Sequence, residues 1–269
     1  MLFRSFGRWL IDNARQAQVY AELAGVNNVV IESTDSYKAM LKNLAFTLSL
    51  YSGQMCTTTQ DIFVPAGGIE TDEGPKSFDQ VAADLGSAVD KFLADPAIAT
   101  AVLGAIQSPD TLKRIKEAPQ LAEVVLASRK IDHPEFPAAS VHSPLLLKAD
   151  TSKESAYLQE RFGPISFVVK VKDWQAAVAL SEQAVKEHGA LTVGLYSTKQ
   201  EVIDAMTAAT LRAGVSLSIN LTGNVYVNQS AAFSDYHATG ANPAATASYT
   251  DSAFVANRFR VIQTRWHAS

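Results

Sequence analysis

The sequence predicts an α/β fold with a mostly parallel sheet, and three observations support this prediction. Residues 165–220 alternate between strand-like and helical segments, an order typical of parallel strands joined by covering helices. Apolar segments at 26–32 and 62–64 have the length and composition of strands. Hydrophobic residues make up 47% of the 269 residues, which is enough to bury a sizeable core.

The first half of the chain combines helical spacing with clear helix ends. Residues 5–21 carry apolar side chains at approximate helical spacing and predict a helix. Residues 34–36 can cap a second helix at 36–51, which we expect to be buried because its later turns are apolar nearly all round. The segment Ser52-Gly53-Gln54 ends that helix. The remaining expected elements of this half are a strand at 62–64, an exposed loop at 65–77 and a helix at 78–93.

The second half carries the regular alternation of strands and helices. Asp173 can cap its clearest helix, which keeps one apolar face as far as His188. Residues 130–143 contain two prolines and predict an irregular segment, and residues 221–250 are polar and lack periodicity. The other expected elements are a helix at 109–117, strands at 145–147, 165–171, 191–196 and 215–220, a helix at 199–212 and a terminal strand within 254–266.

Composition and charge exclude several classes of partner. The net charge of −4 provides no basic surface for nucleic acid or for an anionic membrane. No segment approaches the roughly 20 apolar residues that cross a bilayer, and the first residues do not resemble a signal peptide. A single cysteine excludes an intrachain disulfide and fits a reducing compartment, so we expect a cytoplasmic protein.

Cys56 is the first candidate for chemistry. It follows the buried helix and the Gly53-Gln54 break, so we expect it on a turn whose free backbone amides lie near the sulfur. Such a turn can present a thiolate to a cleft and donate N–H bonds to an oxyanion that forms beside it. The alternative interpretation is a small buried side chain, which is the commoner role of an isolated cysteine.

Two glutamates are further candidates. Glu22 precedes Leu23-Ala24-Gly25 and the strand at 26–32, and a carboxylate at such a junction can reach a cleft at the strand end. Its alternative is an exposed glutamate at the end of a helix. Glu160 lies in the segment Glu160-Arg161-Phe162-Gly163-Pro164, whose alternative interpretation is an ordinary turn.

The histidines show no obvious pattern. The five of them are His133, His142, His188, His237 and His267. Their scatter gives no metal-ligand spacing, so no metal site is predicted. A cysteine-dependent acyltransferase would need a histidine near Cys56; none is close in sequence, and closeness in space stays open. The run Ser234-Asp235-Tyr236-His237 suggests a Ser-His-Asp set, but neighbouring loop residues cannot normally form one. We interpret His237 as part of a polar loop at a subunit or substrate edge.

Taken together, these segments resemble the aldehyde dehydrogenase superfamily over nearly the whole chain. That family has a Glu-Leu-Gly-Gly segment with the general base, a Gly-Gln-x-Cys segment with the nucleophile 34 residues later, and a Glu-x-Phe-Gly-Pro segment that contacts the nicotinamide ribose. Here Glu22 and Cys56 are separated by 34 residues, and Ala24 replaces the first glycine of the first segment. The resemblance implies that Cys56 is the nucleophile and Glu22 the base. It also implies that Glu160 and Phe162 contact NAD or NADP.

The resemblance is closer to the phenylacetate-degradation branch of this family, the PaaN-type proteins. The segments that carry it are 13–20, 24–27, 49–58 and 233–243. The branch implies a small-molecule aldehyde as substrate, in particular a ring-cleavage semialdehyde of aromatic catabolism. Family members are commonly dimers or tetramers, which implies a homo-oligomer.

The resemblance also predicts a domain organisation. Gly7 matches the last glycine of the family's Gly-x-x-x-x-Gly phosphate turn, and the first glycine would fall at Leu2. We therefore expect residues 1–21 to be the last helix of a dinucleotide-binding fold, most of which is lacking in this fragment. Residues 22–225 are expected to form the catalytic domain, and 226–269 a C-terminal tail that could take part in oligomerisation.

The mechanism implied by the resemblance is attack of the Cys56 thiolate on an aldehyde, hydride transfer to the nicotinamide, and hydrolysis of the thioester by water that Glu22 activates. One alternative is a CoA-acylating aldehyde dehydrogenase, in which CoA resolves the thioester; Glu22 favours water. Another is a truncated, noncatalytic remnant of such an enzyme. Both alternatives stay open at the level of sequence.

Overall fold

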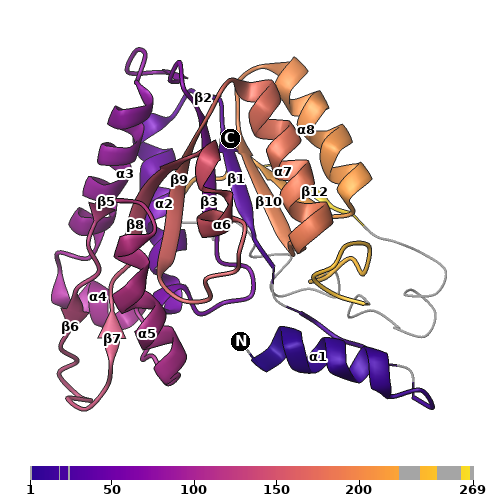
Figure 1. Cartoon of the computed structure of the whole chain (residues 1–269). Coiled ribbons are helices and arrows are strands. Elements are labelled where there is room, and N and C mark those ends of the chain that lie inside the picture. The colour runs from indigo at the N-terminus through magenta and orange to yellow at the C-terminus, as the bar shows by residue number, and fades with distance from the viewer. Residues whose placement is uncertain (1, 18, 24, 224–236, 247–261, 267–269) are drawn as a thin grey trace.

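The computed structural model describes residues 2–17, 19–23, 25–223, 237–246 and 262–266. An eight-stranded sheet runs through the molecule in the order β12-β11-β10-β1-β3-β9-β8-β5 (Figure 1). All neighbouring strands are parallel except β5 and β8. The predicted α/β fold with a mostly parallel sheet is therefore confirmed. The strands of this sheet are β1 (Asn28–Ile31), β3 (Asp61–Pro65), β5 (Glu123–Leu126), β8 (Leu145–Asp150), β9 (Ile165–Val171), β10 (Thr192–Tyr196), β11 (Ser216–Ile219) and β12 (Thr264–Trp266).

Helices cover both faces of the sheet. Helices α2 (Tyr37–Ser49) and α3 (Phe78–Phe92) lie on one face, and α7 (Trp174–His188) and α8 (Gln200–Ala213) lie on the other (Figure 1). Successive side chains of β1 serve opposite faces: Val29 and Ile31 join the core with α2 and α3, whereas Val30 joins the core with α7 and α8. Because both faces are buried, the central strands are continuous apolar runs rather than alternating ones.

The remaining elements are short. The helices are α1 (Leu2–Asn13), α4 (Pro96–Val102), α5 (Pro109–Glu117), α6 (Glu154–Tyr157) and the 3-10 helices at Leu50–Gly53, Ala118–Gln120 and Thr151–Lys153. Two small sheets pair β2 (Ser33–Thr34) with β4 (Glu70–Thr71) and β6 (Lys130–Ile131) with β7 (Val141–His142). No helix in the described part of the chain is both long enough and apolar enough to cross a membrane.

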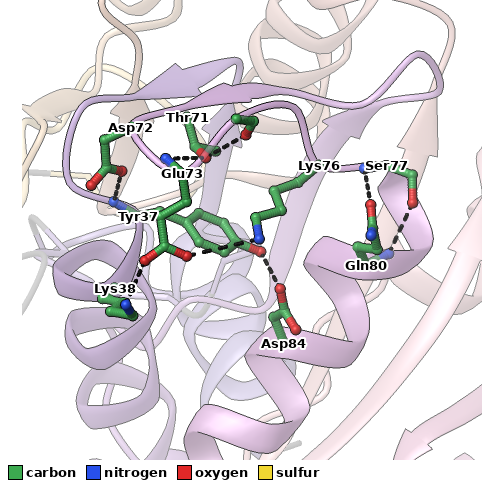
Figure 2. A network of polar contacts seen from close by, with 10 residues as sticks. Tyr37, Lys38, Thr71, Asp72, Glu73, Lys76, Ser77, Gln80 and Asp84 are labelled. Carbon is green, nitrogen blue, oxygen red and sulfur yellow. Dashed lines mark hydrogen bonds and ion pairs between the residues drawn. The ribbon is translucent and has the colours of Figure 1, made fainter.

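Polar contacts hold the loop after β3 against α2 and link α2 to α3, as Figure 2 shows. The backbone N–H of Tyr37 donates to Asp72 at 2.7 Å, and the Tyr37 hydroxyl donates to Asp84 on α3 at 2.9 Å. Lys38 on α2 pairs with Glu73 of the loop at 2.6 Å. This loop follows the C-terminal end of β3, whereas Cys56 precedes its N-terminal end. The network therefore stabilises the edge of the sheet opposite to Cys56.

The predicted helix at 5–21 is too long, because α1 ends at Asn13. The following residues instead approach the chain at 244–246. The N–H of Ala21 donates to the hydroxyl of Thr246, the N–H of Thr246 donates to the carbonyl of Ala21, and Leu23 donates to the carbonyl of Ala244. These contacts satisfy the backbone in an extended form, so tertiary pairing outweighs the weak helical pattern.

The other predicted helices and strands are present within a few residues. The strand predicted at 145–147 is longer, since β8 continues to Asp150, and α4, α6 and β5 were not predicted. Part of the segment that should contain the terminal strand, 254–261, lies outside the described residues, but β12 is present at 264–266 as an edge strand of the main sheet.

Candidate active site

The candidate residues lie at the N-terminal edge of the parallel sheet. Glu22 precedes β1 and Cys56 precedes β3, and the first residues of these two strands, Asn28 and Asp61, are partners in register. Because parallel neighbours begin at the same edge, the two segments that precede them are brought together. The buried side chain of Asn27 joins them: its amide donates to the carbonyl of Cys56 at 2.8 Å and to that of Thr58 at 3.1 Å.

An unusual backbone turn presents Cys56. After α2, Tyr51, Ser52 and Gly53 adopt φ values of 52°, 54° and 62°, a left-handed region that is costly for residues other than glycine. Glycine is required at position 53 because a Cβ atom there would lie 2.7 Å from the carbonyl carbon of Gly163 and 2.9 Å from Cα of Pro164. This close approach sets the Cys56 turn beside the segment that carries Glu160 and Phe162.

Cys56, Glu22 and His237 form a compact polar cluster. The Sγ atom of Cys56 lies 3.3 Å from Nε2 of His237, and the same nitrogen lies 3.0 Å from Oε1 of Glu22. All three atoms lie within 4.8 Å of one another. The side chain of His237 is 5% exposed and that of Glu22 is 24% exposed, so the cluster is shielded from bulk water on the histidine side.

The loop of His237 is anchored to the ends of two helices. Asn242 donates to the carbonyls of Ala190 and Gly214 at 2.8 and 3.0 Å, just beyond the C-termini of α7 and α8. Thr239 also donates to the carbonyl of Gly214, at 2.5 Å. An antiparallel bridge joins Glu22 to Ala245. The segment 237–246 is thus held on the sheet edge next to Glu22.

The surroundings of His237 favour its charged form. Burial alone lowers the pKa of His237, but the hydrogen bonds to Cys56 and Glu22 outweigh burial and raise the pKa to about 10. At neutral pH the ring is therefore an imidazolium between a sulfur and a carboxylate. A positive charge in contact with the Cys56 sulfur is one of the surroundings in which cysteines act as nucleophiles.

A cleft of about 580 Å³ opens in front of this cluster. Cys56, Glu22, Gln54, Glu160 and Phe162 are among the residues that line it. The side chains predicted as nucleophile and base, Cys56 and Glu22, thus line the same cleft.

The sequence-predicted cofactor residues fall into two groups. Glu160 is half-buried and the Phe162 side chain is 38% exposed, and both line the cleft with Cys56. An acidic acceptor and an exposed ring at this position fit a nicotinamide riboside. Gly7 is not among the described residues that line the cleft; it lies in α1 against the side chain of Leu23. Leu2 and Gly7, the two positions of the expected phosphate turn, both lie inside α1.

Two residues of the site were missed by sequence reasoning. His237 was interpreted only as part of a polar loop at a subunit or substrate edge, whereas its ring is buried against Cys56 and Glu22. It is 181 residues from Cys56, and the only pointer in the sequence was the general need of a reactive cysteine for a base. Asn27 was included in a strand without a role. Ser234 and Asp235 of the Ser-His-Asp hypothesis lie outside the described residues.

Comparisons with known proteins identify the family to which the fold belongs. A family model described as "Aldehyde dehydrogenase family" matches residues 4–254. The crystal structure of an NAD-dependent aldehyde dehydrogenase from Burkholderia multivorans is 52% identical, with a TM-score of 0.90 over 96% of this chain and 46% of that chain. The chain thus spans about half the length of that relative. No curated protein matches the chain.

More distant structures share the fold alone. Proline utilization A from Bdellovibrio bacteriovorus is 18% identical with a TM-score of 0.68, over 92% of this chain and 25% of that chain. An NADP-dependent glyceraldehyde-3-phosphate dehydrogenase from Bacillus halodurans, complexed with NADP, is 19% identical with a TM-score of 0.59, over 82% of this chain and 43% of that chain.

Proposed function

The chain belongs to the aldehyde dehydrogenase family, and from this premise we propose that it carries the catalytic half of an enzyme that oxidises an aldehyde to an acid with NAD or NADP. The observation that supports this function most is the cluster of Cys56, Glu22 and His237, of which Cys56 and Glu22 line the same cleft. The site offers a sulfur nucleophile, a histidine in contact with that sulfur, and a carboxylate on the same cleft.

In the proposed first step, the Cys56 sulfur forms a bond to the carbonyl carbon of the aldehyde. The π electrons move to the oxygen, and the oxyanion accepts N–H bonds from the turn that carries Cys56. His237 donates a hydrogen bond from Nε2 to the sulfur and keeps its proton, which favours the thiolate that attacks, and the released sulfur regains this contact at the end of the cycle.

Bound NAD or NADP would supply the acceptor for the hydride that leaves the substrate carbon. Glu160 would hold ribose hydroxyls and Phe162 would lie beside the nicotinamide, because both line the cleft next to Cys56. The relatives that support the cofactor are one described as NAD-dependent and one complexed with NADP.

Glu22 would complete the reaction. It takes a proton from water, the water oxygen attacks the thioester carbon, and the carbon–sulfur bond breaks to release the acid and restore the Cys56 thiolate. Its position on the same cleft favours water over CoA as the acyl acceptor, since CoA would need no base of this kind to resolve the thioester.

For the substrate we propose a semialdehyde of phenylacetate catabolism, supported by the resemblance of segments 49–58 and 233–243 to that branch. We also propose that the protein is a cytoplasmic homo-oligomer. In this proposal residues 1–21 belong to a dinucleotide-binding fold, residues 22–225 to the catalytic domain and residues 226–269 to a tail at the subunit contact. The stacked rings of Phe6 and Trp9 on α1 are each 57% exposed, which suits a helix that packs on further protein.

The function is tested by incubating the purified chain with NAD or NADP and a series of aldehydes while reduced cofactor is followed. We expect Cys56→Ala to abolish the reaction. Glu22→Gln should release one equivalent of reduced cofactor and then stall as the thioester. Glu154→Gln, an exposed glutamate of α6, is the control. A chain that binds neither cofactor and whose Cys56 is inert toward iodoacetamide would support the noncatalytic remnant, and rapid turnover that depends on CoA would support the acylating enzyme.

A further inference from the structure

We propose that Glu22, Cys56 and His237 form a three-ligand site for Zn²⁺, and that zinc bound there reversibly blocks Cys56. The site itself rests on geometry alone. The blocking effect rests on the proposed function, because it presumes that the Cys56 sulfur is the nucleophile.

The three side chains offer the donor set that zinc prefers. A thiolate, an imidazole nitrogen and a carboxylate oxygen come from three distant segments, and the three donor atoms lie within 4.8 Å of one another. Zinc binds such ligands at about 2.0–2.3 Å in a tetrahedron, so neighbouring ligand atoms lie roughly 3.3–3.8 Å apart. The separations of 3.3 Å between Sγ and Nε2 and 3.0 Å between Nε2 and Oε1 need to open only slightly.

Two of the proposed ligands already contact the third. Sγ of Cys56 and Oε1 of Glu22 both contact the same nitrogen of His237. When this nitrogen loses its proton, its lone pair points to the place where the other two donors converge. Zinc replaces whatever protons the Cys56 sulfur and this nitrogen carry, and these protons leave to solvent, which balances the exchange.

The ligands are held in place by a second set of contacts. Asn27 donates a hydrogen bond to the carbonyl of Cys56, and Asn242 holds the loop of His237 by donating to the carbonyl of Ala190. A backbone bridge joins Glu22 to Ala245. Such outer contacts fix the orientation of metal ligands and contribute to affinity. Cys56 and Glu22 line the cleft of about 580 Å³, so an ion can enter from it and a water molecule can take the fourth position.

The ligand chemistry distinguishes zinc from the abundant hard cations. Mg²⁺ and Ca²⁺ prefer sets of oxygen ligands, whereas sulfur and imidazole nitrogen favour zinc. Zinc at this place is an inhibitor and not a cofactor. Coordination uses the sulfur electron pair that would attack the aldehyde, and it also occupies the Glu22 carboxylate that would activate water.

The test is a binding experiment that needs neither aldehyde nor cofactor. The chain, treated with EDTA and a thiol reductant, is titrated with Zn²⁺ and with Mg²⁺ by calorimetry. We expect one zinc per chain and no magnesium. Cobalt in place of zinc should give a sulfur-to-cobalt charge-transfer band and the intense visible bands of a tetrahedral site.

The variants separate this site from other zinc-binding positions. Even outer-shell substitutions lower metal affinity about 10–100-fold, so Cys56→Ser and His237→Gln, which remove direct ligands, should lower it by at least as much. His188→Gln is the matched control, because His188 lines the same cleft but belongs to no cluster with Cys56; it should bind zinc as the unchanged chain does. Circular dichroism and thermal unfolding establish that each variant is folded.

Equal zinc affinity of folded His237→Gln and unchanged chain would overturn the site, and so would a cobalt spectrum without a sulfur band. Either result leaves the proposed aldehyde oxidation untouched. Conversely, a chain that binds one zinc but oxidises no aldehyde would contradict the proposed function and support the metal site. Reversible loss of Cys56 alkylation by iodoacetamide on adding zinc, restored by EDTA, tests the blocking effect separately.

Discussion

The side chain of Asn27 donates a hydrogen bond of 2.8 Å to the backbone carbonyl of Cys56. Its carbonyl oxygen accepts from the N–H groups of Leu191 and Thr192 at 2.9 and 3.2 Å. One buried amide therefore joins the turn of the nucleophile to the starts of β1 and β10. This amide therefore helps to hold the turn of Cys56 against the sheet.

Asn27→Ala should destabilise the chain and loosen the turn. It leaves buried carbonyl and N–H groups without a partner, each of which costs about 1–3 kcal/mol, so we expect a loss of roughly 2–4 kcal/mol in the free energy of unfolding. Urea denaturation measures it. Asn13→Ala is the matched control, since the side chain of Asn13 is exposed and, among the residues that the structure describes, bonds to the carbonyl of Trp9; equal midpoints for the two variants would contradict this role of Asn27.

His237→Gln should slow the alkylation of Cys56 by iodoacetamide at neutral pH by about tenfold, because the imidazolium that favours the thiolate is lost. Glutamine keeps a hydrogen-bonding side chain and removes the charge. Mass spectrometry of samples quenched after a series of exposure times measures the alkylated fraction of Cys56 and gives the rate. His188→Gln serves as the comparison, and an identical rate in all three proteins would mean that His237 does not influence the sulfur.

Gly53→Ala should be strongly unfavourable. Residue 53 has φ of 62°, and the added methyl group would meet the backbone of Gly163 and Pro164. We expect a loss of about 1–3 kcal/mol in the free energy of unfolding. Gly67→Ala is the control, because nothing lies within 4 Å of its Cβ position. If the thermal and urea midpoints of Gly53→Ala match those of the control, the close approach of Gly53 to Gly163 and Pro164 does not require a glycine at position 53.

The ion pair between α7 and α8 predicts a pH dependence of stability. Hydrogen bonds from Arg212 lower the pKa of Glu182 to about 2 despite partial burial, with a smaller contribution from Lys186. Because the folded pKa lies below the unfolded value of 4.5, the stabilisation is complete above about pH 5 and disappears as pH falls toward 2. Glu182→Gln should therefore cost up to about 1 kcal/mol at pH 7.

The difference between Glu182→Gln and the unchanged chain should shrink between pH 5 and pH 3 in urea titrations. Glu187→Gln, which changes an exposed glutamate of the same helix, controls for the loss of one negative charge. A difference that stays constant down to pH 3 would show that Arg212 does not hold Glu182 ionised.

Periodicity was sufficient to predict the layers of the fold. The apolar faces of α2, α3, α7 and α8 and the alternation of strands in the second half are local properties of the sequence, and the structure has them. The end of α1 at Asn13 was not predictable, because it depends on pairing of residues 21–23 with 244–246, more than 200 positions away. Helix α4, with seven residues, is too short for a clear period.

The candidate site was predictable only in part. Cys56 and Glu22 precede strands that the sequence shows plainly, so their shared edge follows from a parallel sheet. His237 follows from none of these patterns. Its loop has no periodicity, and its position depends on Thr239 and Asn242 binding carbonyls beyond the ends of α7 and α8. Such side-chain contacts to distant backbone groups leave no local trace in the sequence.

The pairing of Cys56 with Glu22 is tested most directly by acyl transfer from an activated nitrophenyl ester, which needs no cofactor. The unchanged chain should release nitrophenol continuously, while Glu22→Gln should release one equivalent in a burst and retain an acyl group that peptide mass spectrometry locates on Cys56. Rapid turnover by Glu22→Gln, or an acyl group on any residue other than Cys56, would contradict the account.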